Sequence, residues 1–366
     1  HERTYDFQGD VANNIPLQQG QPDPNEPGTG YLWTSAARHH LTYRNYQEFI
    51  PTAWCDSPPS SWGGAPRPED NCPAGKYLHK GDPLPAELQY PGQPATVEFP
   101  WLVPVVAHNN ATKPELVGHF NPRYADFRLD YPDQYRANIF LNEFATWVND
   151  RKNGRDTMPQ LITMALPNDH TSALRPNFGT PDALVADNDL ALGRIVEAIS
   201  HSPYWDDTAI CVLEDDAQDG VDHVDAHRSI ALIISKYGPA KGTVESHFYT
   251  TVNMVRTIEA LLGLPPMNNN DAHAAVMAPL FSGDGSQAPF TANTSNRENG
   301  RIYKVNPARG AGAAASAKLD WSRPDAANNV VMNRILWRAA MGKKKMPAAR
   351  HAVFPAGARA ADEDDR

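Results

Sequence analysis

Residues 180–213 read TPDALVADNDLALGRIVEAISHSPYWDDTAICVL, and this stretch decides the fold class of the chain. Thr180 and Pro181 are residue types that favour the N-cap and the first position of a helix. The apolar residues behind them can share one broad helical face, which is formed by Leu184, Leu192, Ile195, Val196 and Ile199. The run TAICVL then predicts a buried strand, so the stretch is typical of a helix followed by a strand.

Other parts of the chain repeat this alternation of helix and strand. Helical patterns occur in three further stretches, YLWTSAARHHL (31–41), QYRANIFLNEFATWV (134–148) and TTVNMVRTIEALLGL (250–264). Strand patterns occur in TYRNYQEFI (42–50), MPQLITMALP (158–167) and SIALIISKYGP (229–239). Near-continuous apolar strands that alternate with helices are typical of a mostly parallel sheet covered on both faces. The sequence therefore predicts an α/β fold, with a mostly parallel central sheet flanked by helices and a long irregular insertion.

Four segments are expected from this pattern and from the 33 prolines and 24 glycines of the chain. Residues 1–50 form an entry segment. Residues 51–130 form a loop-rich insertion or cover, and long irregular stretches of this kind inside a domain are usually functional. Residues 131–290 form the α/β core with the polar motifs. Residues 291–366 form a C-terminal extension with one helix and a disordered tail.

The charge balance and the cysteines limit the classes of function. A formal net charge of −10 argues against nucleic-acid binding, because contacts with phosphates need Lys and Arg. No apolar run approaches the roughly 20 residues of a membrane-spanning helix, so no transmembrane segment is expected. Cys55 and Cys72 flank a loop rich in Pro, Ser and Gly, and a bridge between them would suit an oxidising compartment, although the sequence leaves the bridge open. Cys211 lies in the predicted strand and is expected to be a small buried side chain.

Polar residues gather where the predicted strands end. EDDAQDGVDHVDAHR (214–228) places six acidic residues and two histidines directly after TAICVL, and Asn168, Asp169 and His170 follow MPQLITMALP. Like charges this close raise each other's pKa unless a cation or hydrogen-bond donors neutralise them. Two interpretations stay open. One is a solvated acidic loop, and the other is a site for a divalent cation, which mixed Asp and His ligands suit.

Two familiar metal motifs are excluded by spacing. An EF-hand loop that began at Asp215 would have Ala217 and Ala226 at positions where ligand oxygens are needed. The pair of histidines in HVDAH has the spacing of a zinc-protease helix, but Val224 stands where the catalytic glutamate belongs.

Three stretches, in this order, resemble a known family: LPNDHT (166–171), VADNDLALGRIVEAISHSPYWDDTAICVLEDDAQDGVDHVDAHRSIALIISKYGP (185–239) and FYTTVNMVRTIEALLGLPPM (248–267). This is the phosphoesterase family that contains bacterial phospholipases C and acid phosphatases, within the alkaline phosphatase superfamily. The chain is most similar to a bacterial branch that is often joined to a β-propeller. The resemblance extends from RTYDFQGD (3–10) to RPDAANNVVMNRILWRAAMG (323–342), and it implies an alkaline phosphatase-like fold.

The resemblance implies roles for residues of these motifs. Asp215 and Asp216 match the metal-binding pair that follows a central strand, and His227 matches the late metal-binding histidine. His170 matches the histidine of an Asp-x-x-x-His element, although Leu166 replaces the aspartate. His170 and His227 are therefore expected to contact the phosphate or to protonate the leaving group. The implied cofactor is a divalent metal ion, and Zn, Mn, Mg, Ca and Fe all stay open.

Two further histidines are candidates for substrate binding. His119 in GHFNPRY could reach the site from the insertion, and His223 lies in a DHV motif that recurs in the family. A surface position is the alternative for His119, and a loop-stabilising hydrogen bond is the alternative for His223.

The function implied is metal-dependent hydrolysis of phosphoric esters, as part of a larger, secreted or periplasmic parent enzyme. The substrate would be a small phosphate ester or a phospholipid, and an upstream β-propeller domain is a further expected partner. The family's Ser or Thr nucleophile, which forms a covalent phospho-enzyme, has no counterpart in residues 1–30. The alternative is a non-catalytic metal- or ligand-binding fragment or pseudo-enzyme.

Overall fold

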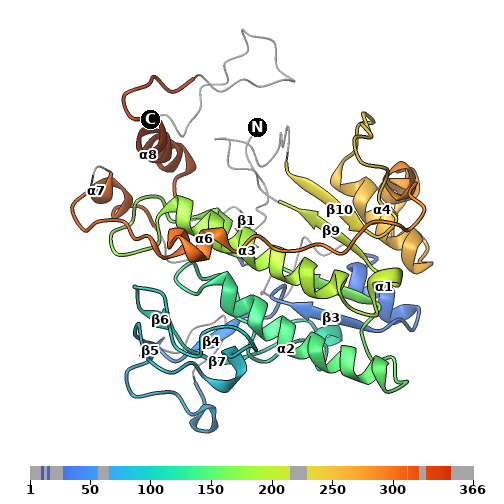
Figure 1. Cartoon of the computed structure of the whole chain (residues 1–366), viewed down its shortest axis with the longest axis horizontal. Coiled ribbons are helices and arrows are strands. Elements are labelled where there is room, and N and C mark those ends of the chain that lie inside the picture. The colour runs from blue at the N-terminus through green and yellow to red at the C-terminus, as the bar shows by residue number, and fades with distance from the viewer. Residues whose placement is uncertain are drawn as a thin grey trace.

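The computed structural model describes most of the chain. It places residues 28–56, 66–214, 229–310, 312–320 and 327–347, together with the backbone of strands β1 (Asp10–Val11) and β2 (Ile15–Pro16). These residues combine helices with small sheets, so the prediction of a mixed α/β fold is confirmed (Figure 1).

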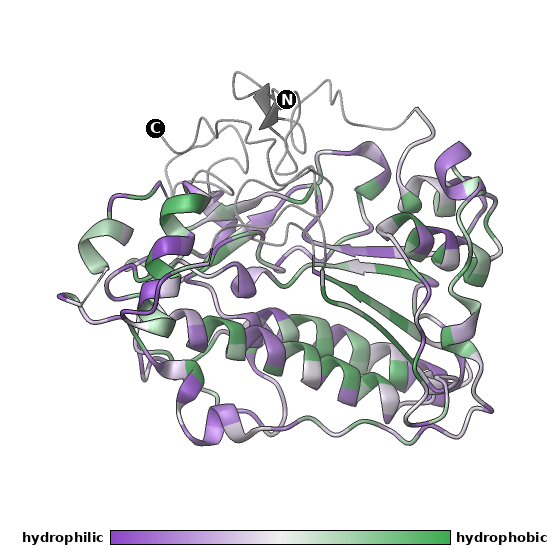
Figure 2. Cartoon of the chain, turned by 90° about the horizontal axis from the view of Figure 1, so that it is seen from above, coloured by the Kyte–Doolittle hydropathy of each residue, from purple (hydrophilic) through white to green (hydrophobic). Residues whose placement is uncertain are grey.

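Two 20-residue helices, α2 (Asp133–Lys152) and α3 (Pro181–Ser200), lie against each other in the middle of the structure (Figure 1). Figure 2 shows hydrophobic and hydrophilic residues side by side on the long helices, as amphipathic helices require. Their apolar faces meet in the main hydrophobic core, where Phe140 of α2 lies with Leu190 and Ile195 of α3. This helix pair forms the centre of the fold.

Shorter elements surround the helix pair. The remaining helices are α1 (Leu32–Arg38), α4 (Thr251–Leu262), α5 (Asn269–Ala272), α6 (Ser295–Glu298), α7 (Ala313–Ser316) and α8 (Asn329–Met341). The remaining strands are β3 (Tyr43–Tyr46), β4 (Thr52–Trp54), β5 (Tyr77–Leu78), β6 (Val103–Pro104), β7 (Val106–Asn109), β8 (Leu161–Met164), β9 (Ala209–Leu213) and β10 (Ala231–Ser235). The stretches whose patterns predicted a helix contain α1, α3 and α4, while α2 extends beyond the predicted range 134–148 at both ends. The stretches whose patterns predicted a strand contain β3, β8, β9 and β10.

The start of α3 follows the local signals of its sequence. Thr180 is the N-cap, and its side-chain oxygen accepts a hydrogen bond from the Ala183 backbone N–H at 3.2 Å. Pro181 occupies the first helical position, where its missing N–H costs nothing. The prediction of this helix start is confirmed.

The sheets are small, and the pairing of their strands differs from the prediction. Strands β3 and β8 pair in parallel, with Tyr43 opposite Leu161 and Tyr46 opposite Met164. The other pairs among the described strands are β9–β10, β4–β7, β5–β6 and β1–β2, and each of them is antiparallel. A large parallel central sheet is therefore not seen in the described part of the chain.

Strands β9 and β10 show how a pair of predicted strands comes to be antiparallel. The backbone N–H of Glu214 donates to the carbonyl of Ile230 at 2.9 Å, and the Ser229 hydroxyl donates to the Glu214 carbonyl. The chain therefore leaves β9 and enters β10 at the same end of the pair, which makes the two strands antiparallel. A short apolar run predicts a strand but carries no information about its direction.

The same two strands are more exposed than predicted. Ile210 and Ile234 face each other and pack onto the main core. Toward the other end, Leu213 is 36% exposed and Leu232 42% exposed, and Cys211 between the ends is half-buried. Partial burial raises the pKa of the Cys211 thiol to about 11. One end of the pair is thus anchored in the core, and the end that leads to residues 214–230 projects from it.

The insertion is held by buried apolar side chains, a disulfide and polar links rather than by long elements. Val97, Phe99 and Val103, for example, lie in the main hydrophobic core. Cys55 and Cys72 form the disulfide that the sequence left open, and the half-buried Arg128 forms an ion pair with Asp56 at 2.7 Å. The Arg128 guanidinium also lies 4.7 Å from the ring centre of Trp54. Together with the buried apolar side chains, these links explain how a stretch with little hydrophobic periodicity is nevertheless ordered.

None of the helices in the described ranges is both long enough and apolar enough to cross a membrane.

Removing the disulfide should destabilise the chain, because the bridge closes a loop across a sequence separation of 17 residues. The double variant Cys55→Ser/Cys72→Ser is expected to lose about 3 kcal/mol of the free energy of unfolding, measured by urea denaturation. Cys211→Ala is the matched control, since it removes a thiol and keeps the bridge. A double variant with the same unfolding midpoint as this control would contradict the prediction.

Candidate active site

The turn after β8 carries the histidine that the sequence motifs single out. Residues Pro167–His170 form a single 3₁₀ turn just beyond the carboxyl end of the parallel pair β3–β8. The His170 ring stands edge-on to Phe127, with ring centres 5.1 Å apart. Its Nδ1 lies 3.2 Å from the carbonyl oxygen of Thr171. His170 therefore lies at a strand end, where ligands gather in α/β folds.

Two buried carboxyl groups lie beneath this turn. Asp133, the first residue of α2, is 0% exposed, and Asp187 of α3 is 1% exposed. Asp133 Oδ1 accepts a hydrogen bond from Arg136 at 2.9 Å. Its Oδ2 accepts from the Asn168 backbone N–H at 3.0 Å and from the Asn188 side-chain amide at 3.1 Å.

Asp187 joins the same turn to the start of α2. Its Oδ2 accepts from the Asp133 backbone N–H at 2.7 Å and from the Asn168 side-chain amide at 2.8 Å. The Gln134 backbone N–H approaches Oδ1 at 3.3 Å. Asp187 thus supplies the acceptor for two N–H groups at the beginning of α2, where the N-cap Pro132 makes no side-chain cap.

Asn188 holds both sides of the turn. Its amide donates to the Leu166 carbonyl at 2.6 Å, just before the turn, and approaches the Asp169 carboxylate at 3.4 Å within it. Together with Asp133 and Asp187, it fixes residues 166–169 to the two central helices. Asp133, Asp187, Asn168 and Asn188 are called the carboxyl–amide network below.

Burial perturbs both acids of the network. Burial, and then the nearby Asp133 carboxyl group, raise the pKa of Asp187 to about 7. The pKa of Asp133 is also raised, chiefly by burial, while the Arg136 guanidinium opposes this shift. Two like charges in one buried site favour retention of a proton by one of them.

The loop that follows His170 has a strained backbone. Thr171, Ala173 and Asn177 have positive φ values of 61°, 49° and 62°, although none of them is glycine. Thr171 combines this φ with a ψ of 175°, a region that β-branched residues rarely enter. Strain of this kind costs about 1–3 kcal/mol per residue and persists only where the surroundings enforce it.

The C-terminal part of the chain enforces the shape of this loop. The Asn306 side-chain amide donates to the carbonyl groups of Arg175 and Gly179, both at 3.1 Å. The hydroxyl of Ser316 accepts from the Leu174 backbone N–H at 2.9 Å. Helix α8 adds an apolar contact, because its buried Met332 and Ile335 cluster with Ala173.

Two hydroxyl groups in the strained loop are buried and unpaired. Thr171 Oγ1 and Ser172 Oγ have no hydrogen-bond partner among the described residues. Buried polar groups normally have a partner, so these two stand out beside His170.

Four of the predicted site residues, Asp215, Asp216, His223 and His227, lie outside the described residues. The residues that flank them, Glu214 and Ser229–Ile230, are hydrogen-bonded to each other. Elsewhere in the described ranges, no group of three or more His, Cys, Asp or Glu side chains could hold a metal ion.

The structure does not bring His119 and His170 together. The His119 ring stacks on Tyr43, with ring centres 4.2 Å apart, and the His119 carbonyl accepts from the Asn45 backbone N–H at 2.8 Å. Tyr43 begins β3, whereas His170 follows the opposite, carboxyl end of the parallel pair. His119 thus contacts the amino end of β3.

The motifs of the sequence do not single out Asp187, although its carboxylate contacts both α2 and the turn. A signal was present, because Asp187 lies three residues after Leu184 and four before Ala191, both of which are buried. Positions with this spacing share a helical face, so Asp187 interrupts the apolar side of α3. A charged residue at such a position indicates a buried polar contact.

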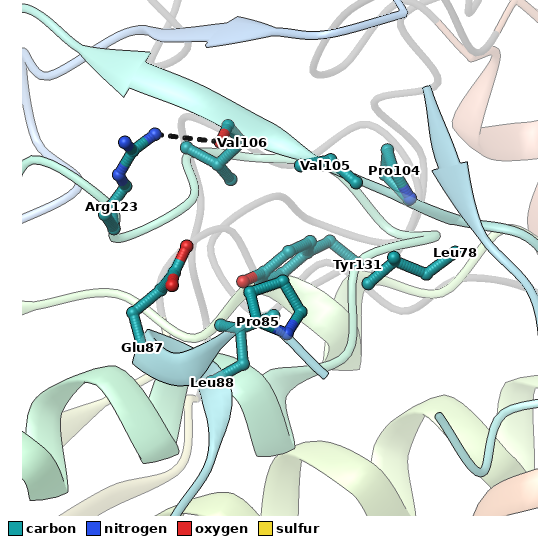
Figure 3. A pocket seen from close by; sticks show the side chains of 9 residues that line it. All are labelled: Leu78, Pro85, Glu87, Leu88, Pro104, Val105, Val106, Arg123 and Tyr131. Atoms are coloured by element: carbon teal, nitrogen blue, oxygen red, sulfur yellow. Dashed lines mark hydrogen bonds between the residues drawn. The ribbon is translucent and has the colours of Figure 1, made fainter. Parts of the chain in front are cut away.

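A separate pocket lies in the insertion (Figure 3). It has room for little more than one water molecule, and its walls are mostly apolar, with Glu87, Arg123 and Tyr131 as polar members. Arg123 donates to the Val106 carbonyl at 3.2 Å. None of the histidines and acids predicted for the site lines this pocket.

Comparison with known proteins adds no relative: no protein-family model matches the chain, and no curated protein matches it. The resemblance to the phosphoesterase family therefore stays a prediction from the sequence motifs.

The raised pKa of Asp187 predicts a stability that falls as the pH rises. Its folded-state value of about 7 exceeds the ordinary value near 4, so the bound proton stabilises the folded chain fully below about pH 4. This contribution is lost as the pH rises through about 7. Asp187→Asn cannot titrate and should flatten this part of the pH dependence of the free energy of unfolding, measured by urea denaturation between about pH 4 and 8.

Asp189→Asn is the matched control, because Asp189 lies two positions further along α3 and is exposed. This control should keep the wild-type slope. Equal slopes for the wild type and Asp187→Asn would show that Asp187 is ionised throughout the range.

Proposed function

We propose that the chain contributes to a metal-dependent hydrolase of phosphoric esters, of the phosphatase and phospholipase C type. The observation that carries the proposal is the position of His170. It lies on a turn fixed by buried hydrogen bonds, directly beyond the carboxyl end of two parallel strands. A histidine held in this way suits proton transfer, which depends on precise placement of the donor.

The ends of the acidic segment support the same proposal. Residues 214 and 230 are joined by a backbone hydrogen bond, so the segment between them begins and ends at one point of the β9–β10 pair. Asp215 and Asp216 directly follow this point in the sequence, and His227 stands two residues before Ser229. We assign the metal to these three side chains.

The proposed roles divide between the metal and His170. A bound divalent cation would polarise a phosphoryl oxygen and stabilise the charge that develops on it. His170 would hydrogen-bond the phosphoryl group or donate a proton to the leaving oxygen. Phe127 contacts the His170 ring, and the carboxyl–amide network holds the backbone that carries it.

We further propose that the parallel pair β3–β8 and the pair β9–β10 belong to one central sheet of alkaline phosphatase type. Ile162 and Met164 of β8 and Ile210 of β9 pack onto the same core, which supports a common sheet. The Cys55–Cys72 disulfide supports a secreted or periplasmic location. The substrate would be a small phosphate ester or a phospholipid, and the net charge of −10 supports the absence of nucleic-acid binding.

The metal assignment is tested on the whole 366-residue chain. The purified protein should bind a divalent metal, measured by elemental analysis after dialysis against Zn, Mn, Mg, Ca or Fe. It should also hydrolyse p-nitrophenyl phosphate or its diester in a metal-dependent way. Asp215→Asn should abolish metal binding and turnover with an unchanged circular dichroism spectrum, while Glu214→Gln serves as the neighbouring control.

The two readouts separate the proposed hydrolase from the alternative of a binding module. Metal binding without turnover would reject hydrolysis by this chain and favour the binding module. An Asp215→Asn variant that binds metal as well as Glu214→Gln does would refute the metal assignment.

The role of His170 gives a second test. His170→Gln should reduce kcat for p-nitrophenyl phosphate by about 10²- to 10⁴-fold, which is the usual effect of removing a general acid. His119→Gln is the control, because His119 stacks on Tyr43 at the amino end of β3. Equal activities of the two variants would show that His170 takes no part in the reaction.

A further inference from the structure

The carboxyl–amide network makes more contacts than a helix cap requires. Capping of α2 accounts for the hydrogen bonds that Asp187 accepts from Asp133 N–H and Gln134 N–H. It does not account for the two bonds made by Asn168, one to each carboxyl group. Those two bonds hold the turn two residues before His170.

The charges around the pair come from several elements. Arg136 of α2 binds Asp133 directly, and Arg194 of α3 donates to the Gln134 side chain at 2.9 Å. Buried Tyr124 precedes α2, and burial raises the pKa of its hydroxyl. Exposed Asp169 is linked to the pair through Asn188. Among the described residues, the donors to the Asp187 carboxylate are neutral N–H groups of Asp133, Gln134 and Asn168.

The strained Thr171 shows that the turn needs such support. Its backbone conformation, at φ 61° and ψ 175°, follows directly after His170. A relaxed loop would change the direction in which the chain leaves His170. The network on one side, and Asn306 with Ser316 on the other, therefore keep the turn in this conformation.

We propose that Asp133 and Asp187 are positioning residues for His170, which act through Asn168 and Asn188 without touching the substrate. The inference rests on the proposed function, because it takes His170 as the proton donor or phosphate ligand. Burial of two carboxyl groups is costly, and an apolar contact would join the two helices at lower cost. The burial of these two carboxyl groups is therefore explained by their hydrogen bonds to the turn.

The experiment compares Asp187→Asn and Asn188→Ala with the exposed control Asp189→Asn. Asn188→Ala leaves the Asp187 acceptor for the start of α2 in place, and it removes the contacts of Asn188 with the turn and with the Asp133 carboxylate. The His170 ring is followed by NMR in the full chain labelled with ¹³C at histidine Cε1, and its resonance is assigned with His170→Gln. Turnover of p-nitrophenyl phosphate and thermal unfolding are measured on the same samples.

Both network variants should shift the His170 resonance and its titration midpoint. They should also lower kcat by up to about 100-fold while KM stays within about 3-fold, because a displacement near 1 Å suffices for such a loss. Asp189→Asn should match the wild type in every readout.

The results distinguish failure of this inference from failure of the proposed function. Lower thermal stability with an unchanged His170 resonance and unchanged kcat would reduce Asp187 to a helix cap and overturn the inference. If the wild type shows no turnover, the proposed function fails, and the NMR comparison alone still decides whether the network positions His170. If Asp187→Asn does not fold, the half-buried position of Asn188 makes Asn188→Ala the deciding variant.

Discussion

The structure depends on how the buried first turn of α2 satisfies its backbone N–H groups. A helix start in water can be capped by solvent, but Asp133, Gln134 and Arg136 are all buried. Pro132 makes no side-chain cap, so the acceptor comes from Asp187, on the neighbouring helix α3. The two central helices are thus joined by a specific polar contact as well as by their apolar faces. An apolar interface alone permits sliding, whereas this contact fixes the register of the pair.

The position of His170 follows from this contact. Asp133 and Asp187 also accept hydrogen bonds from the turn that follows β8, and Asn168 supplies the donor to each of them. The turn then directs the chain into the strained conformation of Thr171, which the C-terminal residues Asn306 and Ser316 stabilise from the other side. Elements from four distant parts of the sequence therefore determine where one imidazole lies.

Local signals predicted those parts of the fold whose causes are local. Thr180 caps α3 as its sequence indicates, and the apolar run before Pro167 forms β8. The sequence did not predict the antiparallel pairing of β9 and β10, since an apolar run is compatible with either direction. The role of Asp187 was missed because its partner, Asp133, lies 54 residues earlier in the chain. His170 was identified by its motif, whereas the residues that hold it are defined only by the tertiary fold.

The buried acids also bear on how the negative charge of the acidic segment, residues 214–228, is neutralised. Asp133 and Asp187 are balanced inside the fold by N–H donors and by Arg136, and buried Glu259 is likewise paired with Arg256 at 3.3 Å. Residues 214–228 contain six acidic side chains and one arginine, so their formal charge is −5 with neutral histidines. If these six carboxylates were neutralised as Asp133 is, by hydrogen-bond donors and an arginine, a comparable number of donors would be needed. The segment itself contains one arginine. The remaining charge can be balanced by donors from other segments, by solvent or by a bound metal ion. Solvent and a metal ion differ in their effect on the carboxyl groups. A metal ion lowers the pKa of the carboxyl groups that bind it, whereas solvated carboxyl groups this close raise the pKa of one another.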